Sequence, residues 1–263
     1  MRKILKIIAR DFFGLIRVCG FVVAFKWLWA VFTHLGECKR SGNLQPADRA
    51  LGDGPFKLRL GKSRATVLAT QALTGIREIW VRDCYLHQFL KIDPAGVVVD
   101  LGCNCGLFTA LALGHGPAVR VIAVEGDPLE CDRFRRSLAA SDWLGRVQLL
   151  NGFVGGHNEM VAEIRGKNQN STLAWIVEDD LMQLVGDSRI NFLKCDIEGS
   201  EFQLFSGSSR LLDAADQIAI EVHPHAGDPQ EFIERLKFAG FEIQISEYPP
   251  TIVVRGRRMK LRG

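Results

Sequence analysis

The sequence lacks several features that would assign it to particular classes of protein. Its 263 residues contain no internal repeat or low-complexity tract, and their formal net charge is only +3. A nucleic-acid-binding surface normally shows clustered lysine and arginine, so no nucleic-acid partner is expected. The seven cysteines form an odd set without the paired spacing of zinc sites. This pattern predicts reduced thiols, no metal site and a cytoplasmic location.

No uninterrupted apolar run is long enough to span a membrane. The best candidate, residues 12–32, is interrupted by Arg17 and Lys26, and each charge would cost about 2.5–3.5 kcal/mol at the centre of a bilayer. No small-x-small cleavage site follows this run, which argues against a removed signal peptide. Residues 1–36 are therefore expected to form an amphipathic and hydrophobic helix that does not cross a bilayer.

The first turns of this helix have a basic side and an apolar side. The basic residues are Arg2, Lys3, Lys6, Arg10 and Arg17, and the apolar residues are Ile4, Leu5, Ile8, Phe12, Leu15 and Ile16. Such a helix is typical of a peripheral anchor on an anionic membrane. It is equally typical of a helix packed on the protein with its basic side in water. Both interpretations stay open, and the first predicts membrane association on the cytoplasmic face.

The rest of the chain divides into two predicted parts. Residues 37–90 are expected to be a linker and lead-in subdomain, because residues 36–55 are rich in glycine, proline, serine and aspartate. Within it, a strand pair is expected at 56–64 and a helix at 65–90. Residues 91–263 are expected to form the main domain.

Strand-like and helix-like segments alternate through this main domain. Strands are expected at 97–101, 119–125, 147–150, 158–165, 190–196, 218–222, 242–247 and 251–255. Helices are expected at 106–113, 128–140, 179–185, 200–212 and 229–239. Alternation of this kind predicts an α/β fold, with a mostly parallel sheet covered by helices on both faces.

Residues 97–109 predict a strand, a glycine turn and a helix. Three consecutive valines suit a parallel strand buried on both faces, and Gly102 and Gly106 let the backbone turn sharply beside a ligand. The order Asp100, Gly102, Gly106 differs from the dinucleotide fingerprint, and Asn104 stands where a pyrophosphate loop usually has glycine. An acid at the strand end repels phosphate, so the turn favours a ligand with an amine and a carboxylate.

Glu125 ends the next strand, about twenty residues further on. An acid at this distance binds the two ribose hydroxyls in nucleotide-binding folds. The alternative is a charge at a helix N-terminus, because Asp127 and Pro128 begin a helix well as N-cap and first residue. With the glycine turn upstream, the ribose contact is preferred for Glu125, and Asp127 is assigned to the cap.

Two motifs together carry a family resemblance. Val-Val-Asp-Leu-Gly-Cys-Asn-Cys-Gly at 98–106, Glu125, and Lys-Cys-Asp-Ile-Glu-Gly-Ser-Glu at 194–201 resemble the FkbM-type family of S-adenosylmethionine-dependent methyltransferases. The second motif is the specific part, because the first is shared by nearly all class I methyltransferases. The chain departs from the family at Cys103, where alanine is frequent, and at Gly126, where proline is frequent.

The resemblance implies a Rossmann-like class I methyltransferase fold, with a seven-stranded sheet whose last strand is antiparallel and an N-terminal helical extension added here. It also implies S-adenosylmethionine as cofactor. The residues that would bind it are Asp100, Gly102, Cys103, Asn104, Gly106 and Glu125. O-methyl transfer is the usual activity in the family.

Asp196, Glu198 and His223 are the candidate catalytic residues. Asp196 is expected at a strand end, where a carboxylate can orient the acceptor hydroxyl or take its proton. Glu198 has the alternative of a charge favoured at a helix start. His223 is a candidate general base or a loop residue. Together with Glu221 it also suggests a divalent metal, although no metal is assigned.

The sequence therefore predicts a methyltransferase that O-methylates a hydroxyl of a sugar, glycan or other polar metabolite. The alternatives are a catalytically inactive methyltransferase-fold scaffold at a membrane and a nucleotide-dependent dehydrogenase. The expected partner is a small-molecule or glycan acceptor, and the sequence does not indicate an oligomeric state.

Overall fold

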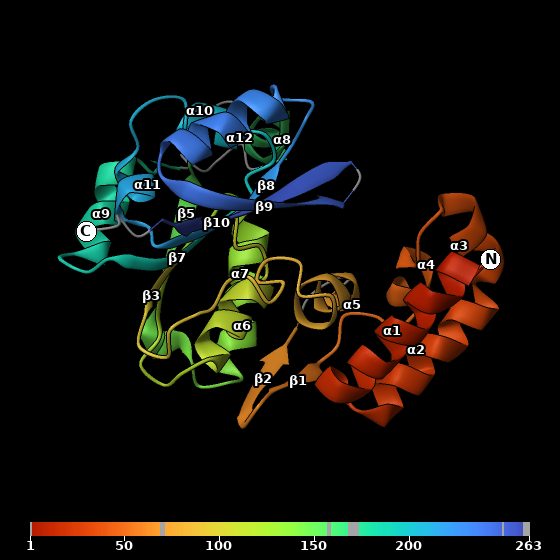
Figure 1. Cartoon of the computed structure of the whole chain (residues 1–263). Helices are drawn as coiled ribbons and strands as arrows, with labels where there is room; N and C mark the ends of the chain where they lie inside the picture. The colour runs from red at the N-terminus through yellow and green to blue at the C-terminus, as the bar shows by residue number, and fades with distance from the viewer. Residues whose placement is uncertain (1, 69–71, 157–158, 168–173, 249, 260–263) are drawn as a thin grey trace.

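The computed structural model describes residues 2–68, 72–156, 159–167, 174–248 and 250–259 (Figure 1). Its central sheet has eight strands in the order β6-β5-β4-β3-β7-β8-β10-β9. They are β3 (Val97–Leu101), β4 (Arg120–Glu125), β5 (Val147–Phe153), β6 (Ala174–Trp175), β7 (Ile190–Cys195), β8 (Gln217–Val222), β9 (Phe241–Tyr248) and β10 (Thr251–Arg258). Neighbours from β6 to β8 are parallel, and β10 is antiparallel to both β8 and β9.

This arrangement confirms the mostly parallel α/β fold and corrects the number of strands. The resemblance implied seven strands, and the eighth is β6, which pairs only Ala174 and Trp175 with the end of β5. A strand of two residues is too short to show an alternating pattern, so it cannot be predicted from the sequence.

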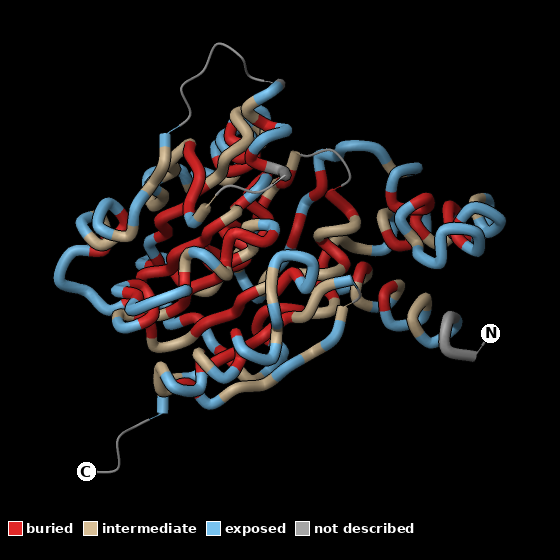
Figure 2. Tube along the Cα trace, turned by 90° about the horizontal axis from the view of Figure 1, so that it is seen from above, coloured by how far each residue is buried: buried red, intermediate tan, exposed pale blue. Residues whose placement is uncertain are grey.

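Side-chain alternation along the strands builds two cores, one on each face of the sheet. On β3, Val98 packs into the core that contains Phe108 and Phe134, whereas Val97 and Val99 pack into the opposite core. The first core is covered by α6 (Leu107–Gly114) and α7 (Pro128–Ala139), and the second by α9 (Glu178–Val185), α11 (Arg210–Ala214) and α12 (Pro229–Phe238). Buried residues concentrate towards the middle of the molecule (Figure 2).

The N-terminal region forms two helices, not the single helix predicted for residues 1–36. The helices α1 (Arg2–Cys19) and α2 (Phe21–Thr33), here called the N-terminal hairpin, are separated by Gly20. Its φ of 90° lies in the left-handed region that glycine adopts most readily, which explains the break. Among the described residues, no helix has the length and apolarity needed to cross a membrane.

The segment predicted as a linker at 36–55 is largely helical. It contains α3 (Leu35–Ser41) and α4 (Gln45–Arg49). Cys38, Ala47 and Asp48 are buried, so tertiary packing stabilises helices that are too short and polar to be predicted from propensity.

A buried ionic network fixes the N-terminal hairpin to the lead-in segment at residues 37–90. Arg77 lies in the π-helical segment η1 (Ile76–Val81) and donates to Asp11 of α1 and Asp48 of α4, both at 2.6 Å. The indole nitrogen of Trp27 donates to Asp48 at 2.8 Å, and Arg82 donates to Asp11 at 2.6 Å. Because each carboxylate has several donors, these buried charges are compensated.

The prediction of a helix at 65–90 is also wrong over much of this segment. β1 (Phe56–Leu60) and β2 (Ser63–Val67) form an antiparallel hairpin, as expected for the strand pair. Among the described residues that follow, α5 (Ala72–Gly75) and η1 are the helical elements, and turns continue up to Leu90.

Two further predictions fail within the main domain. The strand predicted at 158–165 is the helix α8 (Glu159–Lys167), in which Val161 and Ile164 are buried three positions apart, on one helical face; residue 158 lies outside the described residues. The helix predicted at 200–212 is divided into α10 (Glu201–Leu204) and α11. The Ser209 hydroxyl caps α11 by accepting the Leu212 N–H, so a new helix begins there.

Candidate active site

The glycine turn at residues 100–106 packs tightly against the end of β7. Gly102 and Gly106 have φ values of 70° and 88°. A β-carbon on Gly102 would collide with the carbonyl oxygen of Asp196, and one on Gly106 would lie 2.8 Å from the Phe134 ring. Glycine is therefore required at both positions by conformation and by space.

Asp100 lies behind this turn and does not line the cavity in front of it. Its side chain is fully buried, accepts a hydrogen bond from Thr109 at 2.6 Å and lies 3.3 Å from the Lys194 ammonium. Lys194 also donates to the carbonyls of Leu101 and Gly102, at 3.2 and 2.6 Å. Burial lowers the pKa of Lys194, but the carboxylates of Asp100 and Asp196 more than reverse this, so the cation persists and holds the turn.

The two cysteines of the turn are buried thiols. Burial raises the pKa of Cys105 to about 12 and that of Cys103 well above its ordinary value. Both are free of disulfides. Protonated thiols are poor metal ligands, so these side chains fill the space behind the turn.

A cavity of about 270 Å³ opens at the carboxyl ends of β3, β4 and β7. Of the predicted cofactor-binding residues, Gly102, Asn104 and Glu125 line it, whereas Asp100, Cys103 and Gly106 are buried behind it. Other lining residues are Asp127, Gly152, Phe153, Ile164, Asp196 and Glu198. The cavity thus joins the predicted cofactor residues to two predicted catalytic residues.

Glu125 is held in this cavity by backbone donors. Its two carboxylate oxygens accept the N–H groups of Asn104 at 2.7 Å and Asp127 at 2.8 Å. Burial raises its pKa to about 7, although these hydrogen bonds oppose the increase. Asp127 also caps α7 by accepting the Leu129 N–H at 2.9 Å, as the sequence predicted.

Asp196 and Glu221, here called the carboxylate pair, lie together at the ends of β7 and β8. The Tyr85 hydroxyl lies 3.2 Å from an Asp196 oxygen and 3.3 Å from a Glu221 oxygen. Thr251 donates to the other Glu221 oxygen at 2.6 Å. Burial raises the pKa of Asp196 above its ordinary value and that of Glu221 to about 7.

Tyr85 is the functional candidate that sequence reasoning missed. It lies in a segment predicted to be helical and belongs to no motif, so its sequence carries no signal for this position. Burial, together with the nearby Asp196 charge, raises the pKa of Tyr85 well above its ordinary value. The phenol therefore stays protonated and can donate to either carboxylate.

His223 lies between three carboxylates. Its Nδ1 is 3.1 Å from Glu201, and its Nε2 is 3.2 Å from Glu198 and 3.9 Å from Asp196. Burial lowers the pKa of His223, but hydrogen bonds with Glu198 and Glu201 raise it to about 10. The ring is therefore an imidazolium at neutral pH. Glu201 is buried and also accepts the N–H groups of His223 and Gly199, both at 2.8 Å.

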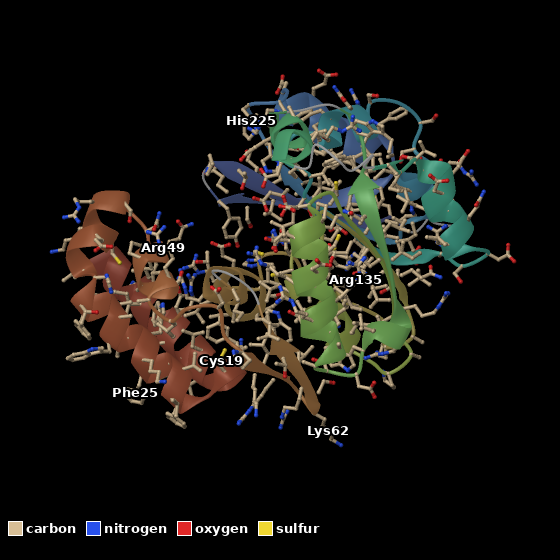
Figure 3. All side chains as sticks on the ribbon, turned by 180° about the vertical axis from the view of Figure 1, so that it is seen from behind. Cys19, Phe25, Arg49, Lys62, Arg135 and His225 are labelled. Atoms are coloured by element: carbon tan, nitrogen blue, oxygen red, sulfur yellow. The ribbon has the colours of Figure 1, made fainter. Side chains whose placement is uncertain are left out.

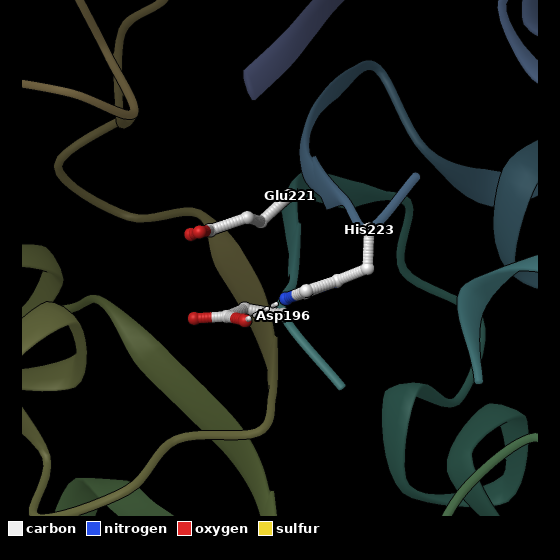
Figure 4. Close-up of side chains that lie close together, drawn as sticks. All are labelled: Asp196, Glu221 and His223. Atoms are coloured by element: carbon white, nitrogen blue, oxygen red, sulfur yellow. Dashed lines mark ion pairs between the residues drawn. The ribbon is translucent and has the colours of Figure 1, made fainter. Parts of the chain in front are cut away.

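Asp196, Glu221 and His223 converge at one point (Figure 4), where one donor atom from each lies within 4.8 Å of the others. Carboxylate and imidazole groups at this spacing can bind a divalent cation. Such an ion would have to displace the proton of His223 and compete with Tyr85 for both carboxylates. The absence of a metal stays a prediction of the sequence.

Comparison with known proteins finds methyltransferase relatives. The Methyltransferase FkbM domain matches residues 100–243. The 31-O-demethyl-FK506 methyltransferase FkbM of Streptomyces tacrolimicus is 25% identical over 240 residues, which cover 74% of this chain and 91% of that protein. Methyltransferase 1 of Beauveria bassiana (strain ARSEF 2860) is 24% identical over 202 residues, which cover 64% of this chain and 80% of that protein.

Solved structures with a similar chain trace include two methyltransferases. Precorrin-6y C5,15-methyltransferase from Geobacter metallireducens GS-15 is 11% identical with a TM-score of 0.45, over 73% of this chain and 91% of that chain. A putative rRNA-methylase from Clostridium thermocellum is 16% identical with a TM-score of 0.44, over 64% of this chain and 89% of that chain. The domain match spans more than half of the sequence, and the chain therefore belongs to the FkbM methyltransferase family.

Proposed function

We propose that this methyltransferase takes its methyl group from S-adenosylmethionine and transfers it to a hydroxyl of a sugar, glycan or other small polar molecule. One observation carries the proposal: a single cavity is lined by Glu125 on one side and by Asp196 and Glu198 on the other. This supports a donor site and acceptor-binding carboxylates that would share one space.

The cavity has features that fit S-adenosylmethionine. Each Glu125 oxygen accepts one backbone N–H and keeps a lone pair for a ribose hydroxyl. Phe153 and Ile164 provide an apolar wall for a base, and Gly102 exposes backbone without a side chain. When bound, the cofactor supplies an electrophilic methyl group on a sulfonium. Asp100, with Lys194 behind the turn, would shape this site without touching the ligand.

The carboxylate pair is better suited than His223 to take the acceptor proton. The His223 ring is already protonated at neutral pH, so it cannot act as a base there. Glu221 has a pKa raised to about 7, close to the value at which a general base is most effective. We assign proton removal to the carboxylate pair, orientation of that pair to Tyr85, and charge compensation of Asp196 and Glu198 to His223.

The surroundings of the carboxylate pair fit a hydroxylated acceptor. A second cavity of about 520 Å³ is lined by Glu198, Glu221, His223, His225 and Thr251, and Glu198 borders both cavities. Such polar groups hydrogen-bond hydroxyls well. The name of the Streptomyces relative specifies an O-demethyl substrate, which supports O-methyl transfer here as well.

Calorimetric titration of the full chain tests the donor. We expect S-adenosylmethionine and S-adenosylhomocysteine to bind and NAD not to bind. Binding of NAD alone would support the dehydrogenase alternative and contradict the proposal. Binding of S-adenosylmethionine without methyl transfer to any fraction of a cell extract would support an inactive scaffold.

A further inference from the structure

The outer side of the N-terminal hairpin is unusually aromatic. Phe21, Phe25, Trp29 and Phe32 of α2 are 65, 57, 71 and 65% exposed, and Phe13 of α1 is 68% exposed. We call these five residues the aromatic face. Figure 3 shows Phe25 on the outer edge of the hairpin, away from the sheet.

These aromatic residues lie on the face of α2 that does not pack against the protein. The residues of α2 that are buried are Ala24, Trp27, Ala30 and Val31, and they already fill the contact with the protein. Phe25 lies 5.2 Å from Phe12 and 6.5 Å from Phe21, between ring centroids. Phe12 is half-buried and lies 5.5 Å from Phe13, so aromatic contacts connect the two helices. A contiguous exposed apolar patch of this kind marks an interaction surface.

Positive charge accompanies the aromatic face. Residues 1–50 contain nine lysines or arginines and three acids, a formal net charge of +6, which leaves −3 for the rest of the chain. Two of the three acids, Asp11 and Asp48, are buried in the network around Arg77. Lys6, Arg17 and Lys26 are exposed on the two helices. Of the three acids, only Glu37 on α3 is exposed, so the exposed cations of this region outnumber its exposed anions.

We propose that the aromatic face docks the enzyme on an anionic phospholipid bilayer, with α1 and α2 lying in the interface and the main domain in water. Aromatic side chains favour the headgroup level, and flanking lysines and arginines favour anionic lipids. A groove of about 480 Å³ beside the face, lined by Lys26, Trp29 and Phe56 among others, offers one cation and apolar walls to a lipid headgroup.

A second copy of the chain is a poorer occupant of this face. In a two-fold dimer the same patch meets itself, so the excess positive charge of each hairpin would approach its own equivalent. A bilayer with anionic lipids has the complementary charge. The buried network at Arg77 holds the hairpin against α4 and η1, so the face is presented without unfolding any part of the described chain.

Vesicle flotation of the chain of residues 1–263 tests this inference. The vesicles are phosphatidylcholine alone or phosphatidylcholine with about 30% phosphatidylglycerol, which supplies the anionic headgroups. We expect flotation with the anionic vesicles, a loss of bound protein at high salt, and little binding to the neutral vesicles. Lys26→Glu should lower the partition coefficient about tenfold, and its control, Lys237→Glu at an exposed position of α12, should not.

The triple variant Phe21→Ser, Phe25→Ser, Trp29→Ser should also lower the partition coefficient, by about tenfold or more, because it removes apolar area from the membrane interface. Phe238→Ser is the matched control, since Phe238 is 95% exposed on α12. Absence of flotation, or flotation unaffected by Lys26→Glu and by the triple variant, would overturn the inference. Self-association in sedimentation equilibrium that the triple variant abolishes would assign the face to a second copy instead.

Discussion

At the scale of single side chains, burial sets the charge of Glu125. Its pKa of about 7 lies above the ordinary value of 4.5, so the carboxylate is largely formed only above neutral pH. If it binds the ribose, affinity for S-adenosylmethionine should fall as pH is lowered through about 7. Glu125→Gln should weaken binding by about 1.5–3 kcal/mol at pH near 8 and should remove this pH dependence. Calorimetry measures both, and equal affinities of variant and wild type near pH 8 would exclude the ribose contact.

Tyr85 belongs to the same scale, because one hydroxyl connects both carboxylates of the pair. Burial raises the pKa of Asp196, and the hydrogen bond from Tyr85 opposes that increase. Tyr85→Phe should therefore lower kcat about tenfold and move the acid limb of its pH profile to higher pH, with affinity for S-adenosylmethionine unchanged. Tyr248→Phe, at the only other tyrosine, is the control. An unchanged pH profile would remove Tyr85 from the mechanism.

At the scale of elements, His223 connects the end of β8 to the segment after β7 through its contacts with Glu198 and Glu201. Its pKa is raised from 6.5 to about 10 by Glu198 and Glu201 against the effect of burial, with Asp196 also facing the ring. The protonated ring thus contributes stability that is complete below pH 6.5 and is lost as pH rises through about 10.

His223→Gln should remove this part of the pH dependence, on the order of a few kcal/mol. The free energy of unfolding in urea is measured for the wild type and the variant at pH values from about 6 to about 10. Parallel curves for the two proteins would show that the imidazolium does not stabilise the fold.

The network around Arg77 connects three other elements, α1, α4 and η1. Arg77→Ala leaves Asp11 and Asp48 buried without their main cation, which should cost about 3–5 kcal/mol in free energy of unfolding. Arg135→Ala removes an exposed pair with Asp132 and should cost about 0.5 kcal/mol or less. A loss below about 1 kcal/mol for Arg77→Ala would contradict the anchoring role.

The elements also show what the sequence can predict. Strands β3, β4, β7 and β8 are recognisable because burial on both faces demands continuous apolar runs. α3 and α4 are not, because tertiary contacts stabilise them. Asp48 of α4 is buried among partners from distant segments, and Cys38 of α3 packs into the core. The same holds for β6, whose two residues depend on β5 alone.

At the scale of the whole molecule, the topology decides which residues meet. Glu125, Asp196 and His223 were predictable because strand ends in a parallel sheet gather at one edge. Tyr85 reaches Asp196 across 111 positions of sequence from a segment without regular secondary structure, and no local pattern encodes such a contact. The burial of Asp100 behind the turn follows from Lys194 on the neighbouring strand, which composition and spacing do not reveal.

The central claim is that the carboxylate pair serves O-methyl transfer from S-adenosylmethionine. It is tested most directly by incubating the enzyme with methyl-labelled S-adenosylmethionine and fractionated cell extract, then following the label into product. We predict an alkali-stable methyl ether, formed at least about a hundredfold more slowly by Asp196→Asn and at the normal rate by the exposed control Asp179→Asn. Label on nitrogen or in an alkali-labile ester, or an Asp196→Asn rate equal to that of the wild type, would contradict the account.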